Sequence, residues 1–324
     1  MNESEFVDRR RKDWDRLLEL CALGENSPKA LGGTLLVEFV RLYRLAAADL
    51  SRARTESSNL VLISQLNQLV GRAYAVLYRN PRKGVAETLR GALLAGAQAV
   101  RQARVFIFLS VGLLLASFAL HWAVLDTRPD VRTSVIAPME EDLFGRWKEG
   151  SFDVRTDGEN AGMWAFYATN NPLVTIVWVS QGIATAGVGS VGGLWQLGRQ
   201  LGALSFEMNS VGKLGFFYAS IAPHGASELT GAMLAAAAGL NLGWAILNPG
   251  RRSRTLALKQ AGRVSMILLV KAFIMMLIAA PFEAFFSFNP AFESWFKALV
   301  GVLIFSAWML YWTSYGRDLD AAKG

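Results

Sequence analysis

The chain has 324 residues, of which 52% are hydrophobic and 18% charged, and it carries a net charge of +7. This composition is too apolar for an ordinary soluble protein, and the single cysteine, Cys21, excludes intrachain disulfides and cysteine-based metal clusters. Basic cytoplasmic ends of a membrane protein explain the positive charge more simply than nucleic-acid binding does. The sequence therefore predicts an all-α polytopic membrane protein with no nucleic-acid partner.

Residues 1–104 carry a net charge of +6 and contain four segments of helical periodicity. Apolar residues recur at spacings of three and four, as at Phe39 and Tyr43. The third segment ends at the helix breaker Asn80-Pro81, whereas the fourth shows no stop before the membrane. No apolar stretch of signal-peptide type precedes residue 100. We therefore expect a cytoplasmic helical bundle.

Residues 105–125 form the first predicted span, since about 20 apolar residues cross a bilayer core. Arg101 and Arg104 flank its start, and positively charged flanks stay inside. Residues 126–171 then form an extracytoplasmic loop, with a net charge of −4.

This loop contains a predicted short helix with Leu143, Phe144 and Trp147 on one face. The plainer interpretation is a helix resting on the membrane surface. The alternative is a docking face for an extracytoplasmic partner.

Residues 172–208 are apolar and rich in glycine, and they predict a helical hairpin that turns near residues 187–190. GxxxG pairs let helices approach closely. Two such pairs occur here, Gly189 with Gly193 and Gly198 with Gly202. We favour the interpretation that these pairs pack helices within one chain, and the alternative is that they form the interface of a homodimer. The protein is expected to be a homodimer.

Residues 212–221 form a short apolar run that is predicted to re-enter the membrane from outside and to break at Pro223, giving a broken helix over 212–229. A full span follows and ends at Pro249-Gly250, just before a basic cluster that belongs in the cytoplasm. Two further spans, 264–282 and 296–312, complete about six crossings. The transmembrane domain is thus predicted over residues 105–316, with a cytoplasmic tail at 317–324 and both termini inside.

Ionisable side chains within a membrane mark functional sites by default. His224 and Glu228 are four residues apart, which places them on one helix face, and Glu283 is predicted at a similar depth. Asn241 and Lys271 lie deeper. The central position of Lys271 favours an ion pair with a buried carboxylate, and the alternative is a side chain that snorkels to the membrane interface. The cluster permits a structural hydrogen-bond network, a proton relay or a metal site.

The sequence contains no phosphate-binding loop, nucleophile elbow or dinucleotide fingerprint. No cofactor and no nucleotide-driven or serine-hydrolase activity is therefore predicted.

Several motifs together resemble the stage II sporulation protein M family. They are Pro223-His224-Gly225 with Glu228-Leu229, Ala238-Gly239-Leu240 with Gly243, Pro249-Gly250 followed by arginines, and Ile278-Ala279-Ala280 with Glu283-Ala284. The sequence departs from the expected pattern at Arg199-Gln200, where an apolar stretch is typical. The resemblance implies a multi-spanning envelope protein. In sporulating bacteria the protein that gives this family its name helps to anchor a peptidoglycan-degrading complex during engulfment.

We therefore expect a non-enzymatic scaffold in the inner membrane that positions envelope or cytoplasmic partner proteins. The alternative is a transporter or channel-like protein that uses the His/Glu/Lys cluster, and a third option is an intramembrane metal-dependent enzyme. A scaffold predicts a closed, dry cluster. A transporter predicts a cavity that reaches the cluster, and an enzyme predicts a bound metal.

Overall fold

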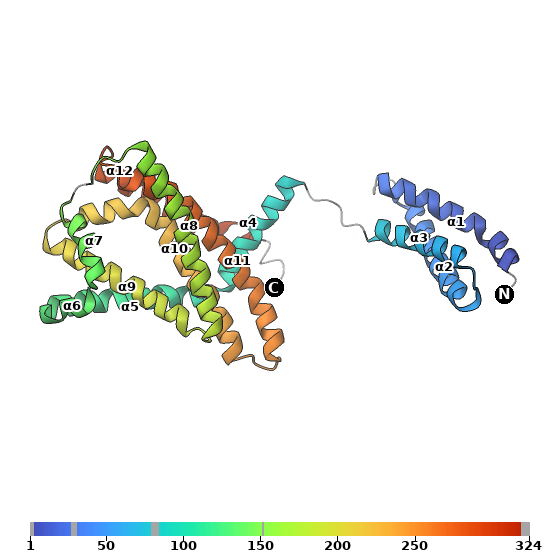
Figure 1. Ribbon diagram of the computed structural model, residues 1–324, viewed down its shortest axis with the longest axis horizontal. Coiled ribbons are helices and arrows are strands. Elements are labelled where there is room, and N and C mark those ends of the chain that lie inside the picture. The colour runs from blue at the N-terminus through green and yellow to red at the C-terminus, as the bar shows by residue number, and fades with distance from the viewer. Residues whose placement is uncertain (1–2, 27–30, 79–83, 151, 319–324) are drawn as a thin grey trace. The chain divides into compact units, whose positions relative to one another are not determined.

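The structure, a computed structural model, describes residues 3–26, 31–78, 84–150 and 152–318, and no strand occurs in those ranges (Figure 1). The chain divides into two compact units, Met1–Glu87 and Thr88–Gly324. The predicted breaker Asn80-Pro81 and most of the predicted tail, 317–324, lie outside the described residues.

The N-terminal unit contains α1 (Glu3–Asn26), α2 (Thr34–Glu56) and α3 (Leu60–Leu77). Their apolar faces meet in a core that includes Leu17, Phe39 and Ala73. Asp49 is buried in this unit, where Arg10 Nε and Trp14 Nε1 donate to its carboxylate at 2.8 and 2.9 Å. Because both donors come from α1, this contact fixes α1 against α2.

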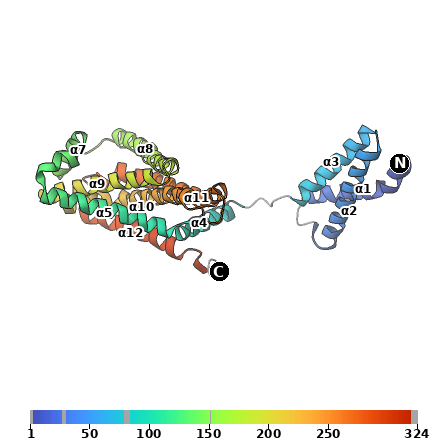
Figure 2. The same ribbon diagram turned by 90° about the horizontal axis from the view of Figure 1, so that it is seen from below.

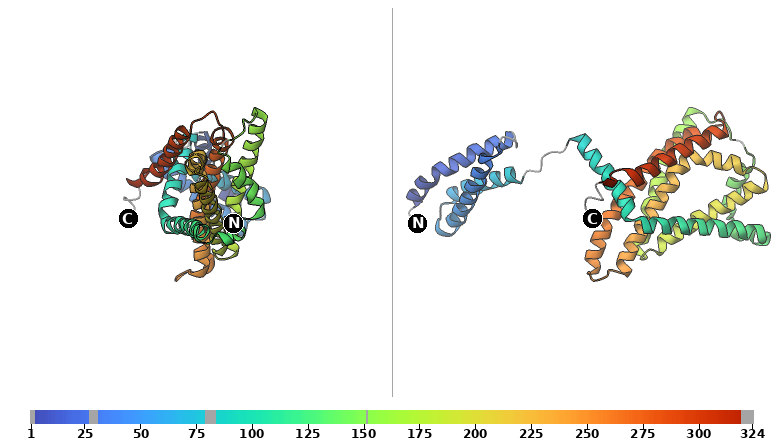
Figure 3. Two further views of the ribbon diagram at one scale, coloured as in Figure 1. Left: turned by 90° about the vertical axis from the view of Figure 1, so that its left-hand side faces the viewer. Right: turned by 180° about the vertical axis from the view of Figure 1, so that it is seen from behind.

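The second unit is a helical bundle, which Figures 2 and 3 show from further directions. Its elements are α4 (Val85–Gln102), α5 (Arg104–Thr127), η2 (Pro129–Val131), α6 (Arg132–Val135), α7 (Pro138–Lys148), α8 (Asp157–Ala184), α9 (Val188–Ser210), α10 (Leu214–Leu247), α11 (Arg254–Pro281), η3 (Phe282–Ser287) and α12 (Ser294–Ser314). The helix α10 lies at the centre and packs against α5, α8, α9, α11 and α12. Small side chains permit this close approach, since residues 235–238 are four fully buried alanines.

The fourth predicted helix belongs to the second unit rather than to the N-terminal bundle. It also does not run into the first span, as predicted, because a turn at Ala103 separates α4 from α5. Ala99 and Ala103 are buried in the core of the second unit. Arg101 Nη1 donates to the carbonyl oxygen of Trp312 at 2.9 Å, so α4 is attached to the end of α12.

The predicted break at Pro223 is wrong, because α10 is one helix of 34 residues with Pro223 inside it. Residues 212–221 are therefore not a separate re-entrant segment. A proline removes one backbone donor and crowds the preceding turn, which bends a helix without ending it when the surrounding packing holds both halves. Figure 1 shows this bend, where the yellow N-terminal part of α10 meets the rest of the helix at an angle.

The predicted hairpin is formed by α8 and α9, which join at a turn where Gly187 adopts a φ of 101°. A Cβ on Gly193 would lie 2.6 Å from Trp178 of α8, and one on Gly202 would lie 2.4 Å from the Phe118 carbonyl oxygen of α5. Gly189 and Gly198 meet α8 and α5 in the same way. Both GxxxG pairs thus pack within one chain, and they provide no free seam for the expected homodimer.

Among the described residues, five helices are long and apolar enough to cross a membrane. They are α3, α5, α10, the continuous stretch Arg254–Ser287 and α12. Four of the five belong to the second unit, which makes the chain a membrane protein. The fifth, α3, buries Leu62, Leu66 and Leu69 on one face, a spacing typical of a bundle helix. Neither α8 nor α9 meets the same criterion, so six crossings remain a prediction.

Candidate functional site

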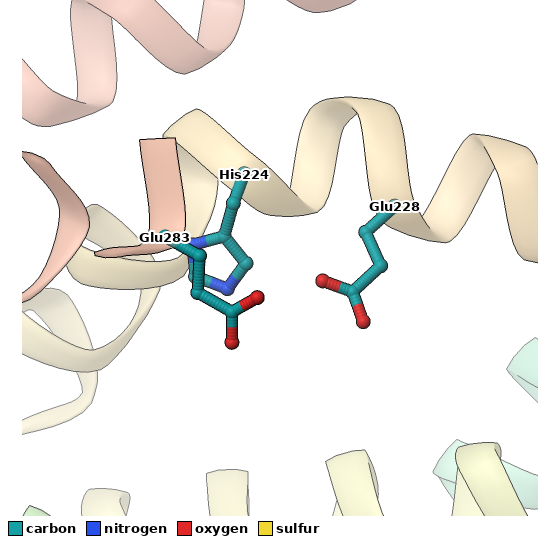
Figure 4. A group of neighbouring side chains, drawn as sticks. All are labelled: His224, Glu228 and Glu283. Carbon is teal, nitrogen blue, oxygen red and sulfur yellow. The ribbon is translucent and has the colours of Figure 1, made fainter. Parts of the chain in front are cut away.

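The structure brings His224, Glu228 and Glu283 together (Figure 4). One ligand atom from each residue lies within 4.8 Å of the other two. His224 and Glu228 project from α10, and Glu283 projects from η3. The predicted proximity of these three side chains is therefore confirmed.

Irregular backbone positions the cluster. The η3 segment is a π-helical turn, a form that is rare and is frequently found at functional sites. This wider turn carries both Glu283 and Ser287 to α10, where Ser287 Oγ lies 2.7 Å from Nδ1 of His224. On the opposite side, Pro223 bends α10 directly before His224. The site thus forms where two helices depart from regular geometry.

Residues that the sequence analysis placed in the outer loop complete the site. Asn171 Nδ2 donates to Oε2 of Glu283 at 3.2 Å, and Tyr167 lines the same cavity as Glu283. Both side chains lie on α8, which begins at Asp157 rather than near Pro172 as predicted. The capping box of Thr156 and Glu159 was the signal for this earlier start, because Thr156 Oγ1 accepts from the backbone N–H of Glu159.

A cavity of about 650 Å³, which we call the outer cavity, reaches His224 and Glu283. Aromatic side chains, among them Trp147 and Phe288, form much of its wall. Arg155 also lines it, with its guanidinium 5.6 Å from the centroid of the Phe288 ring. Nη1 of Arg155 is buried and has no hydrogen-bond partner among the residues that the structure describes. The cavity wall therefore combines aromatic side chains with four acidic residues and one basic residue, Arg155; the acidic residues are Glu149, Asp153, Glu159 and Glu283.

Beyond the cluster, the interior becomes apolar and closely packed. Ala235 and Ala238 lie about 10 to 15 Å further along α10, at 1.5 Å per residue. They contact an equally buried layer from α11 that includes Leu268, Ala272 and Met275. These five side chains are fully buried. This apolar layer thus closes the outer cavity on the side away from residues 129–150.

The sequence matches the family described as Stage II sporulation protein M over residues 105–288, more than half of the chain. This protein belongs to the stage II sporulation protein M family. Residues 4–79, which cover α1–α3, match a second family, described as a domain of unknown function. No curated protein matches the chain, and no solved structure does. All three residues of the cluster lie within the region that defines the family.

Two predicted members of the polar cluster lie elsewhere. Asn241 Nδ2 donates to Oγ of Ser265 at 3.0 Å and thereby joins α10 to α11. Lys271 Nζ lies 5.8 Å from the centroid of the Tyr311 ring, and no ion pair to Lys271 occurs in the described part of the chain. The predicted pairing of Lys271 with a carboxylate is wrong because 12 residues of helix, about 18 Å, separate it from Glu283.

The predicted amphipathic helix of the outer loop is α7, and its apolar face packs on protein rather than facing a membrane. Phe144 and Trp147 are buried against Leu204 and Met208 of α9 and Phe217 of α10. The side chain of Leu143 lies outside the described residues. The apolar face of α7 therefore covers the protein, because apolar side chains on α9 and α10 are within reach. We call residues 129–150, which hold η2, α6 and α7, the outer cap.

Ion pairs hold the outer cap on α9. Arg199 Nη2 lies 2.7 Å from Oε1 of Glu140, and both side chains are largely buried. Arg132 similarly bridges Glu141 and Glu207, and Lys148 also pairs with Glu207. The Arg199 guanidinium lowers the pKa of the Glu140 carboxyl. This pair explains the departure from the family pattern at Arg199, because a charged residue on α9 has its counter-ion in the cap of the same chain.

Proposed function

We propose that this protein is a non-enzymatic scaffold of the inner membrane whose outer cavity receives an extracytoplasmic partner. The observation that carries the proposal is the shape of the cavity. It is wide enough for a side chain or a chain terminus, and it is closed beneath by the layer of Ala235, Ala238 and Leu268. Such a blind cavity suits reception of a partner better than passage of a solute.

The direction of the cavity follows from charge. Arg101 and Arg104 before α5, and the basic residues between α10 and α11, favour the cytoplasmic side. The outer cap and the cavity belong to the other ends of these helices. We therefore place the cavity on the extracytoplasmic side and the N-terminal unit in the cytoplasm, where it is available to a second partner.

The transporter alternative is favoured by one observation. His224 and Glu283 line a cavity, whereas the scaffold hypothesis predicted a closed and dry cluster. A transporter would need a second conformation in which the apolar layer opens toward the cytoplasm. Proton or ion flux through liposomes that contain the protein, abolished by Glu228→Gln, would support this alternative.

Site-specific photo-crosslinking in intact cells tests the scaffold function. Val154 lines the outer cavity and is 83% exposed, whereas Val302 of α12 is 60% exposed and does not line it. A photoreactive residue at position 154 should give a discrete protein adduct that is absent from position 302. Arg155→Ala should reduce the adduct at position 154, since it removes the cation in the cavity wall. Equal adducts at both positions, together with Glu228-dependent flux, would contradict the proposal.

A further inference from the structure

We propose that His224, Glu228 and Glu283 bind one divalent transition-metal ion of the Zn²⁺ class. An imidazole nitrogen and two carboxylate oxygens form a ligand set that such ions accept, at about 2.0 to 2.2 Å from the metal. The three ligand atoms already lie within 4.8 Å of one another. Ligation requires these atoms to approach one another further, and the rotatable side chains of the two glutamates permit such a movement.

The hydrogen bond of His224 orients the ring for ligation. Nδ1 lies 2.7 Å from Oγ of Ser287, which is fully buried. A metal-binding histidine typically donates its other ring N–H to a nearby oxygen, which fixes the tautomer and the plane of the ring. With the proton on Nδ1, Nε2 keeps its lone pair. In the described residues no hydrogen bond to Nε2 is found, so this atom is available to a metal.

The charges of the site require a cation or a shared proton. Glu228 and Glu283 approach each other while partly buried, and no ion pair within 4.0 Å links either carboxylate to a described side chain. Glu283 accepts a hydrogen bond from Asn171, whereas no hydrogen bond from a described residue to the Glu228 carboxylate is found. The Arg155 guanidinium acts electrostatically on Glu283 alone, and two partly buried carboxylates this close together remain unfavourable when both are charged. A divalent ion neutralises both and also ligates His224.

The surroundings of the site match an open metal site. Three protein ligands leave a coordination position for water or another ligand. His224 and Glu283 line the outer cavity, so this position has an access route from the cavity. The π-helical turn of η3 and the proline bend of α10 hold the ligands in place from two helices. The proposal is independent of whether the protein acts as a scaffold or a transporter.

Zn²⁺ binding by the full-length protein in nanodiscs provides the test. After treatment with a chelator, the wild type should bind one Zn²⁺ per chain in a calorimetric titration. His224→Ala, Glu228→Gln and Glu283→Gln should each weaken this binding at least about 100-fold. Two matched controls should bind as the wild type does. They are His121→Gln, at a histidine on α5 that bonds to the Ser117 carbonyl, and Glu159→Gln, at an exposed carboxylate of the cavity wall.

Two further measurements keep the test decisive if a ligand variant fails to fold. Ser287→Ala retains all three ligands and should weaken Zn²⁺ binding by about 10- to 100-fold through the loss of ring orientation. Co²⁺ in the wild type should give visible absorption bands of a four- or five-coordinate ion. Failure of the wild type to bind stoichiometric Zn²⁺ would overturn the proposal in favour of a shared proton, and unchanged binding by His224→Ala would overturn it in favour of another site.

Discussion

At the scale of single residues, the glycines of α9 show why small side chains recur in this sequence. A Cβ on Gly202 would lie 2.4 Å from a backbone carbonyl oxygen of α5, which cannot yield as a flexible side chain would. We therefore expect Gly202→Ala to destabilise the protein by about 1 to 3 kcal/mol, the usual cost of overpacking. Gly192→Ala, on the same helix with open space at its Cβ, should be neutral or slightly stabilising. Thermal unfolding in detergent measures both, and equal melting temperatures for the two variants would contradict the packing described.

The polar cluster was predictable from sequence only in part. The spacing of His224 and Glu228 fixes their shared face, since any helix places residues four apart on one side. Ser287 and Asn171 escaped prediction because their contacts depend on a π-helical turn and on the packing of α8, neither of which a local pattern encodes. Lys271 lies deeper than the cluster, as predicted, but 12 residues of helix separate it from Glu283, and its ammonium group faces the Tyr311 ring instead of a carboxylate.

At the scale of elements, the outer cap is held by carboxylates that titrate. Arg199 lowers the pKa of Glu140 below its ordinary value of 4.5. Because the pKa is lower in the folded state, the ion pair stabilises the cap when the pH is above the ordinary pKa of 4.5. This stabilisation is lost as the pH falls through the folded-state pKa. We expect α7 to be protected at neutral pH and to open below about pH 4.5. Amide hydrogen exchange over residues 138–148, corrected for intrinsic rates, checks this.

The matched control for the cap is Glu140→Gln. This variant lacks the titrating group, so α7 should exchange faster at neutral pH and should depend less on acidification. Arg199→Gln should also open the cap, and by more, because it leaves the largely buried Glu140 without its counter-ion. Wild-type protection of α7 that persists unchanged well below the folded-state pKa would show that aromatic packing alone holds the cap.

Helices were predicted more reliably than their boundaries. The hairpin turn near Gly187 and the end of α10 at Pro249-Gly250 were confirmed, since glycine and proline constrain the backbone locally. The break at Pro223 and the continuity through Ala103 were wrong. In both places tertiary packing decided the outcome, as a buried proline was accommodated within α10 and a small buried alanine allowed a turn.

At the scale of the whole molecule, the account joins a membrane-embedded bundle to a separate N-terminal unit of three helices. The family match and the apolar helices establish the membrane bundle. Two sequence observations favoured a homodimer, and the structure supports neither of them. The glycine pairs pack within the chain, and α4 does not continue into α5. The orientation of the bundle, and with it the side to which the outer cavity belongs, is the claim on which the proposed function depends.

Cysteine labelling in sealed cells tests that claim most directly. Cys21 is the single cysteine and is buried, so a Cys21→Ser background is simple to prepare. A membrane-impermeant thiol reagent should label Val154→Cys at the outer cavity from outside. It should label Ser253→Cys, between α10 and α11, only after the cells are opened. Labelling of Ser253→Cys in sealed cells, with Val154→Cys protected, would show the opposite topology. It would contradict the proposal that the outer cavity receives an extracytoplasmic partner.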